Sequence, residues 1–238
     1  MPQTPDQTVD VAVIGGGSAG ICAALSAARH GSTVALLEAS NTLGGMGTRA
    51  LVHTFCGLYH PDTSQPPRPA NPGLPAEIER AMRQRTGQSA PDKMGKVYVL
   101  RQDPGVFAKL AHELTSAEDH LEVLLNTPCL GIKQDEGFQL QTLRQTIHAR
   151  SLVDTSGDAI AASFLGATRI TADTLQRSAF IFALRNTPPR NPGGAVPHAA
   201  RPQNRPRRPS WRPAKSDAGS RFASFHRGWR DLLHHRSR

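Results

Sequence analysis

The most constraining feature of the sequence is a glycine-rich turn that joins an apolar run to an alanine-rich run. Residues 9–14 (VDVAVI) are almost uninterruptedly apolar and β-branched, which is typical of a strand buried on both faces of a parallel sheet. Residues 21–29 (ICAALSAAR) have the pattern of a helix, and residues 33–37 (TVALL) read as a second buried strand. This order predicts a βαβ unit and therefore an α/β fold with a parallel central sheet.

The turn itself, GGGSAG over residues 15–20, has the spacing G-x-G-x-x-G. Gly15 permits the bend out of the strand, Gly17 leaves room for a pyrophosphate beside the backbone, and Gly20 lets the helix pack closely on the sheet. The helix start offers free N–H groups and a partial positive charge to phosphates. Glu38 follows at the end of the second strand, where a carboxylate can accept both hydroxyls of an adenosine ribose. These features together predict a Rossmann-like, dinucleotide-binding domain.

Two other interpretations of the turn are weaker. It could be a glycine-rich turn without a ligand, but that would leave the flanking strand, the helix and the acid unexplained. Residues 16–20 also satisfy the G-x-S-x-G pattern of a hydrolase nucleophile elbow. The dinucleotide interpretation is favoured because the same glycines fit it and Glu38 is properly spaced beyond them.

Two further segments carry a resemblance to a known family. Residues 43–48 (LGGMGT) form a second glycine-rich bend, and residues 152–167 (LVDTSGDAIAASFLGA) read as the end of a strand, a turn and a helix. Together with the first unit they resemble the FAD-dependent oxidoreductases of the glutathione-reductase-type fold, in particular the branch related to fumarate reductase flavoproteins. That branch usually has Asp-Ala-Thr-Gly-Asp where this chain has DTSGD, and both changes keep small residues. The resemblance covers about residues 8–185.

The resemblance implies FAD as the cofactor and assigns it a set of residues. They are Gly15, Gly17, Ser18, Ala19, Gly20, Glu38, Ala39, Gly45, Met46, Thr48, Cys129, Ser156, Gly157 and Asp158.

Their roles follow the course of the chain. The first glycine turn would hold the pyrophosphate, Glu38 the adenosine ribose, and the second glycine bend would continue toward the flavin. A strand at 121–125 and a bend at 126–128 would place the backbone of Cys129 at the adenine. The turn at 156–158 would return the chain to the first glycine turn.

The sequence assigns no catalytic residue and no metal. Residues 51–59 resemble the segment beside the isoalloxazine, and His53 and His60 lie in or next to it, with a structural role favoured over proton donation. Cys56 has no second cysteine at the spacing that dithiol reductases of this fold need. Cys22 fits a helix core, and no group of cysteines and histidines has zinc spacing.

The remaining patterns suggest further elements of an FAD-binding domain over residues 1–170, with a helical and loop insertion at about 61–116. We expect a Pro-rich loop at 61–75, helices at 76–85, 105–114 and 159–165, strands at 96–100 and 147–153, and a small β-hairpin formed by 138–143 and 145–149. Residues 171–190 resemble the start of a substrate domain. That domain is expected to be incomplete, because the family is usually longer and the likeness stops there.

The charge of the chain is concentrated at its C-terminal end. Residues 201–238 carry ten Arg and one Lys against two Asp, so this segment accounts for the whole net charge of +9 and residues 1–200 are balanced. Residues 191–238 are expected to form a basic, Pro- and Arg-rich disordered tail. A frameshifted C-terminus is the favoured origin, with a nucleic-acid-binding arm or a disordered extension without a partner as alternatives.

These observations predict an FAD-dependent oxidoreductase acting on an unidentified small molecule, with a nucleic-acid partner disfavoured. A catalytically inactive, truncated nucleotide-binding remnant and a nucleic-acid-associated protein using the basic tail are the alternatives. No apolar run approaches the ~18 residues of a membrane span, so no membrane association is expected. The start of the chain has no basic region typical of a signal peptide and there are few cysteines, which favours a cytoplasmic location.

Overall fold

The βαβ unit expected at the start of the chain is present. The structure is a computed structural model that describes residues 5–168, 170, 174 and 180–181. Strand β1 (Gln7–Ile14) leads into helix α1 (Ser18–Arg29) and then into strand β2 (Val34–Leu37). The two strands are parallel, with Val13 opposite Leu36. Helix α1 begins earlier than the alanine-rich pattern indicates, because the second half of the glycine turn already has helical geometry.

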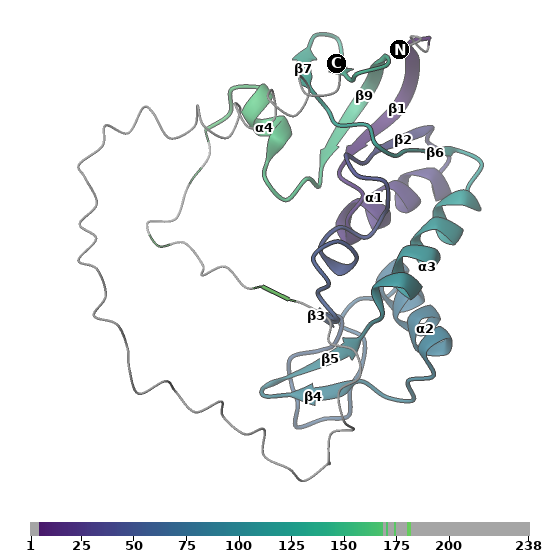
Figure 1. Cartoon of the computed structure of the whole chain (residues 1–238), viewed down its shortest axis with the longest axis vertical. Helices are drawn as coiled ribbons and strands as arrows, with labels where there is room; N and C mark the ends of the chain where they lie inside the picture. The colour runs from purple at the N-terminus through teal and green to yellow at the C-terminus, as the bar shows by residue number, and fades with distance from the viewer. Residues whose placement is uncertain (1–4, 169, 171–173, 175–179, 182–238) are drawn as a thin grey trace, which may run out of the picture. The chain divides into compact units, whose positions relative to one another are not determined.

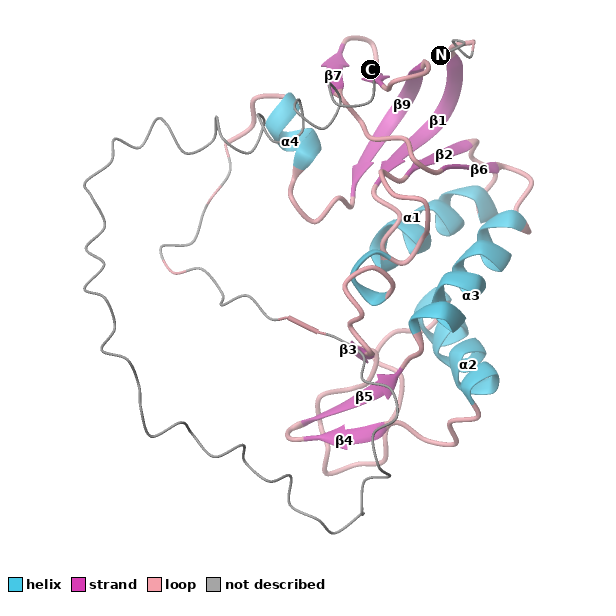
Figure 2. Cartoon of the chain, viewed as in Figure 1, coloured by secondary structure: helices cyan, strands magenta, loops and turns pink. Residues whose placement is uncertain are grey.

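The main sheet has six strands in the described part of the chain, in the order β6-β2-β1-β9-β8-β7. Figure 2 labels β6, β2, β1, β9 and β7. Strands β6 (Leu121–Leu124), β2, β1 and β9 (Thr146–Asp154) are parallel, whereas β8 (Phe138–Gln141) and β7 (Gly131–Gln134) continue the sheet in antiparallel pairing. The prediction of a mostly parallel central sheet is confirmed. The second hairpin strand and the strand at 147–153 are one continuous strand, β9, which pairs with β8 on one side and β1 on the other.

The insertion between β2 and β6 contains two helices and a small antiparallel sheet. Helices α2 (Leu74–Thr86) and α3 (Pro104–Ser116) match the expected helices, and the sheet has the order β3-β5-β4 (Figure 1). Strand β5 (Val97–Arg101) was expected from the sequence. Its partners β3 (Thr54–Cys56) and β4 (Asp92–Met94) were not, because three residues are too few to show a period of two.

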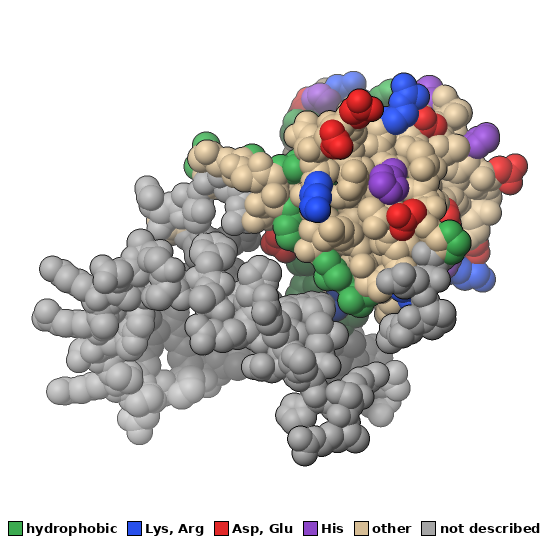
Figure 3. Space-filling view, turned by 90° about the horizontal axis from the view of Figure 1, so that it is seen from above, with side chains coloured by type: hydrophobic (Ala, Val, Ile, Leu, Met, Phe, Trp, Pro, Cys, Tyr) green, Lys and Arg blue, Asp and Glu red, His purple; other side chains and the backbone are tan. Residues whose placement is uncertain are grey.

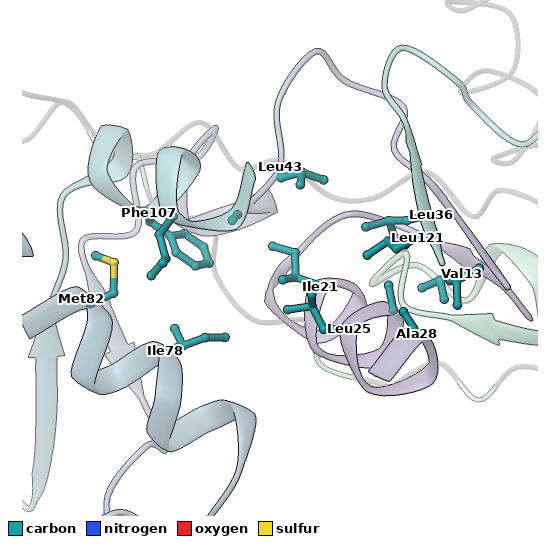
Figure 4. Packing of buried hydrophobic residues seen from close by; sticks show 14 of the residues in the cluster. Val13, Ile21, Leu25, Ala28, Leu36, Leu43, Ile78, Met82, Phe107 and Leu121 are labelled. Carbon is teal, nitrogen blue, oxygen red and sulfur yellow. The ribbon is translucent and has the colours of Figure 1, made fainter. Parts of the chain in front are cut away.

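Apolar side chains cover both faces of the parallel strands. Along β1, Val13 packs into a cluster with α1, α2 and α3, whereas the next residue, Ile14, packs into a second cluster with β7, β8 and β9. Figure 4 shows the first cluster, with Ile21 and Leu25 of α1 between the sheet residues and Phe107. Burial on both faces is the physical reason for the almost unbroken apolar run of β1.

The surface of the described body carries charges of both signs. In the view of Figure 3, acidic and basic side chains are interspersed, as the balanced composition of residues 1–200 predicts. No helix within residues 5–168 combines the length and apolarity needed to cross a membrane. The expected first strand of a substrate domain at 171–184 and the basic tail at 191–238 lie outside the described residues, apart from isolated positions in the former.

Candidate cofactor-binding site

The glycines of the first turn differ in whether the surrounding structure leaves room for a side chain. Gly15 has a φ of 101°, and a Cβ atom there would lie 2.7 Å from the carbonyl oxygen of Thr155. A Cβ atom on Gly20 would lie 1.8 Å from the carbonyl oxygen of Gly15, which is the close helix–strand approach expected from the sequence. Around Gly17, by contrast, no described residue other than its chain neighbours has a heavy atom within 4 Å of the Cβ position.

The start of α1 faces this open space. Gly17 is the N-cap residue with a φ of −73°, and no side chain in the described chain caps the helix. The first turn contains no acidic residue, and Ser18 and Ala19 are exposed. The N–H groups at the start of α1 therefore meet the requirements of an anion site, and the space beside Gly17 fits a pyrophosphate.

Glu38 is held at the end of β2 by hydrogen bonds on both carboxylate oxygens. It is 8% exposed; its Oε2 atom accepts from the N–H of Gly16 at 2.7 Å, and its Oε1 atom accepts from the N–H of Ser40 at 2.8 Å. The carboxylate thus lies directly against the first glycine turn. Each oxygen retains a further lone pair, so the group can still accept hydrogen bonds from a ligand. Ala39, the next residue, is exposed.

The second glycine turn packs against the first. It contains the short 3-10 helix η1 (Gly45–Gly47), and the N–H of Gly44 donates to the carbonyl oxygen of Gly16 at 2.8 Å. A Cβ atom on Gly45 would lie 3.0 Å from the Cα atom of Gly17. The Thr48 hydroxyl donates inside the turn to the carbonyl oxygen of Leu43 at 2.9 Å, whereas Met46 is 68% exposed. The two glycine turns therefore form one continuous backbone surface.

The bend after β6 also reaches Glu38. The N–H of Thr127 donates to the carbonyl oxygen of Glu38 at 2.9 Å, and the N–H of Asn126 donates to that of Ser40 at 2.8 Å. This bend leads to Cys129, which is half-buried and donates from its thiol to the carbonyl oxygen of Gly131 at 3.5 Å. Burial raises the pKa of the Cys129 thiol. The thiol of Cys129 is thus engaged within the chain.

The turn at 156–158 is joined to the first glycine turn through Thr155, and Asp154 closes the turn internally. The Thr155 hydroxyl lies 2.8 Å from the carbonyl oxygens of Ile14 and Gly15. Asp154 accepts from the N–H of Ser156 at 3.0 Å and from that of Ala161, at the start of α4 (Ile160–Phe164), at 2.8 Å. Burial works against ionisation of Asp154, but these hydrogen bonds outweigh it and lower the pKa of the carboxyl group.

The structure thus brings the predicted residues together at the carboxyl ends of β1, β2, β6 and β9, where ligands bind in open α/β sheets. His53 and His60 lie in the insertion. His53 is exposed, and the Nδ1 atom of half-buried His60 lies 3.3 Å from the backbone nitrogen of Asp62. Cys22 is half-buried beside the first core cluster, in keeping with its expected place, and burial raises the pKa of its thiol.

Two residues that the sequence did not single out support the second glycine turn. The Phe107 ring would meet Cβ atoms placed on Gly44 or Gly47 at 3.1 Å. The buried amide of Gln102 donates to the carbonyl oxygens of Gly47, at 2.7 Å, and Val52. The available signal was faint: Asp103-Pro104 marks the start of a helix, but nothing in the sequence says that this helix start meets a distant glycine turn.

A third contact outside the sequence predictions ties the segment after β3 to α2. The Tyr59 hydroxyl is buried and donates to Glu79 at 2.7 Å. Burial, with the Glu79 carboxylate adding to it, raises the pKa of Tyr59. The contact fixes the insertion and lies outside the predicted set of cofactor residues.

Several solved structures are similar to parts of this chain. A p-nitrophenol 4-monooxygenase from Pseudomonas putida is 16% identical, with 67% of this chain and 44% of that chain covered and a TM-score of 0.47. A glycine oxidase from Geobacillus kaustophilus is also 16% identical, with 67% and 59% covered and a TM-score of 0.45. The alignments thus span about half the length of these two proteins. A comparison with curated proteins gave no match.

The family comparison agrees with the site. The family model described as FAD dependent oxidoreductase matches residues 10–229, which include the βαβ unit, both glycine turns and the Asp154–Asp158 turn. The match extends beyond residue 185, where the resemblance seen in the sequence ends. FAD is the cofactor of this family, and the space beside Gly17 and the start of α1 fits its pyrophosphate. The chain belongs to the FAD-dependent oxidoreductase family.

Proposed function

We propose that this chain binds FAD with the pyrophosphate at the first glycine turn and acts as an oxidoreductase on a small-molecule substrate. The observation that carries the proposal is the difference between Gly17 and its neighbours. Gly15, Gly16 and Gly20 each meet a neighbouring atom at 2.7 Å or less from their Cβ positions. Gly17 has an ordinary φ and open space, so packing within the described chain does not require a glycine there. A ligand phosphate beside the backbone does.

The other residues extend this assignment along the cofactor. Glu38 would accept hydrogen bonds from the adenosine ribose, because its buried carboxylate is fixed beside the turn and retains free lone pairs. The Cys129 backbone would lie at the adenine. The second glycine turn, with Gly45, Met46 and Thr48, would continue toward the flavin.

In this assignment the chain binds and orients, and FAD supplies electron and hydride transfer when bound. The N–H groups at the start of α1 stabilise the negative charge of the pyrophosphate. Thr155 and Ser156, at the start of the turn after β9, support the first glycine turn at Gly15. The apolar cluster beneath the two turns keeps water away from their inner side.

The test is a Gly17→Val variant of the full chain. At φ −73° the added Cβ atom of the valine has open space around it, and valine is a less favourable N-cap than glycine, so we expect the variant to fold with a melting midpoint only slightly below that of the wild type. Its side chain fills the pyrophosphate space, so we expect no flavin on purification and no FAD binding in a fluorescence titration. A folded Gly17→Val protein that retained FAD would place the phosphate site elsewhere.

The matched control is Ser26→Val, which puts the same side chain on an exposed position of the same helix. We expect this variant to bind FAD as the wild type does. ADP, titrated in parallel, probes the adenosine and phosphate part of the site alone. A wild-type chain that bound neither FAD nor ADP would overturn the proposed function.

A further inference from the structure

The side chain of Gln102 has an unusual hydrogen-bond arrangement. It is 6% exposed, and its Nε2 atom donates to the carbonyl oxygens of Gly47 and Val52. Its Oε1 atom is fully buried and has no hydrogen-bond partner among the described residues. A buried acceptor without a partner costs free energy, and such a group in a native structure calls for an explanation. Rotating the amide would bring the oxygen against two carbonyl oxygens, so the backbone of the turn imposes the present orientation.

The two carbonyl groups bracket a strained piece of backbone. Between them, Leu51 has a φ of 54°, a left-handed conformation that is uncommon for a residue with a bulky side chain. The N–H of Val52 donates back to the carbonyl oxygen of Met46 at 3.1 Å. A strained residue persists where its surroundings determine its conformation, and the Gln102 amide contacts both ends of this segment.

Gln102 is itself fixed from both directions. Its N–H donates to the carbonyl oxygen of His53 at 2.8 Å, next to the pairing of β3 with β5. The following residue, Asp103, caps α3 by accepting from the N–H groups of Gly105 and Val106 at 2.8 and 3.0 Å. The Phe107 ring, one turn further along, packs against Gly44 and Gly47. The start of α3 therefore presents two side chains to the second glycine turn.

We propose that Gln102 is a positioning residue for FAD, which fixes the Gly47–Val52 segment in the conformation that receives the flavin-side half of the cofactor. Gln102 acts through the carbonyl groups of Gly47 and Val52 and is not itself assigned a contact with FAD. The inference rests on the proposed function, because the role of the second glycine turn at the cofactor is part of that proposal. The segment needs a side-chain amide at residue 102 that donates two hydrogen bonds. This requirement explains why the unpaired oxygen of the same amide is tolerated.

The test compares two ligands on the full chain. In the proposed assignment FAD spans both glycine turns, whereas ADP reaches the first turn, Glu38 and the Cys129 backbone but not the second turn. Gln102→Met keeps the length of the side chain and removes both polar atoms. We expect the Kd for FAD to rise about tenfold, equivalent to about 1.4 kcal/mol, with the Kd for ADP unchanged. The absorption spectrum of the bound flavin should also shift relative to the wild type, because the flavin is held less firmly.

A second variant and a control make the result specific. Gln102→Asn retains the amide but is one methylene shorter, so we expect a smaller loss of FAD affinity, again without a change for ADP. Thr115→Val removes a buried hydroxyl that donates to Ala111 within the same helix, far along α3 from Gln102. This control should lower stability without changing the ratio of FAD to ADP affinity.

The outcomes separate the two proposals. A wild-type chain that binds both ligands, with unchanged FAD affinity in Gln102→Met and Gln102→Asn, would overturn the inference alone. Parallel losses of FAD and ADP affinity with a lower melting midpoint would show a merely structural role and would also overturn it. A wild-type chain that binds neither ligand would overturn the proposed function and this inference together.

Discussion

The two glycine turns at the candidate site are held by different kinds of contact. The first turn, Gly15–Gly20, lies inside one βαβ unit, and its packing comes from that unit, from Glu38 and from the turn after β9. The second turn, around η1, is supported by Gln102 and Phe107 at the start of α3, some 55 residues later in the chain. The comparison shows that the first turn is fixed mainly by backbone packing, within its own βαβ unit and against the turn after β9, whereas the second is fixed by two side chains at the start of a helix.

The largest effect is expected for the distant support of the second turn. Phe107→Ala removes a ring that is 1% exposed and that packs against Gly44, Gly47 and, edge to face at 4.8 Å, Phe55. We expect the free energy of unfolding to fall by about 3–5 kcal/mol, measured by urea denaturation.

A control on the same helix tests whether the effect on the turn is specific. Leu110→Ala, at an equally buried position, should also cost about 2–5 kcal/mol of stability. In the folded state it should leave the ratio of FAD to ADP affinity unchanged, whereas Phe107→Ala should weaken FAD preferentially. Equal ratios for the two variants would contradict the role given to Phe107.

The first turn should be most sensitive at Gly20. A Cβ atom there would lie 1.8 Å from the carbonyl oxygen of Gly15, and backbone atoms cannot move aside as a flexible side chain can. We expect Gly20→Ala to destabilise the fold by about 3 kcal/mol, the upper end of the usual cost of overpacking. Gly17→Ala makes the same chemical change in open space and should cost no more than about 1 kcal/mol, the usual cost of a poorer N-cap residue. Comparable losses for both variants, in thermal or urea unfolding, would refute the distinction between these glycines.

In the proposed function Glu38 joins the first turn to the ribose of FAD, so its replacement tests affinity more than folding. Glu38→Ala removes the acceptor of two backbone N–H groups and the expected partner of the ribose hydroxyls. We expect FAD binding to weaken by about 1–3 kcal/mol, measured by titration of the apo chain. Glu113→Ala, which removes an exposed carboxylate of α3, is the matched control and should leave the Kd for FAD unchanged. Unaltered flavin retention in Glu38→Ala would remove Glu38 from the site.

The smallest effect is a pH dependence at the turn that supports the first glycine turn from β9. The hydrogen bonds that Asp154 accepts lower its pKa below the ordinary value of 3.8, against the opposing influence of burial. Its contribution to stability is therefore complete above that value and is lost as the pH falls through the lower pKa of the folded state. Asp154→Asn should lose less stability than the wild type on acidification from pH 5 to pH 2. Identical pH profiles would show that this carboxylate adds nothing to the turn.

Local patterns accounted for most of the main sheet. Strands β1 and β2 could be predicted from the sequence, because burial on both faces requires a nearly continuous apolar run. Helix α1 could also be predicted, from its alanine-rich pattern. The exact bounds differ by a few residues, as at Ser18, where helical geometry begins inside the glycine turn. Strands β3 and β4 escaped prediction because they are short and their side chains are mostly half-buried or exposed. The pairing partner, rather than an internal pattern, makes them strands.

The sequence by itself determined the βαβ unit, the first glycine turn and the acid at the end of the second strand. Each of these depends on residues close together in the chain, where the constraints on φ, on helix packing and on charge are local. Only the tertiary structure decided that Gln102 and Phe107 support the second glycine turn and that Glu38 binds the N–H of Gly16. Such contacts join residues through a shared core, and any amide or ring of suitable size could have filled these positions without leaving a pattern in the sequence.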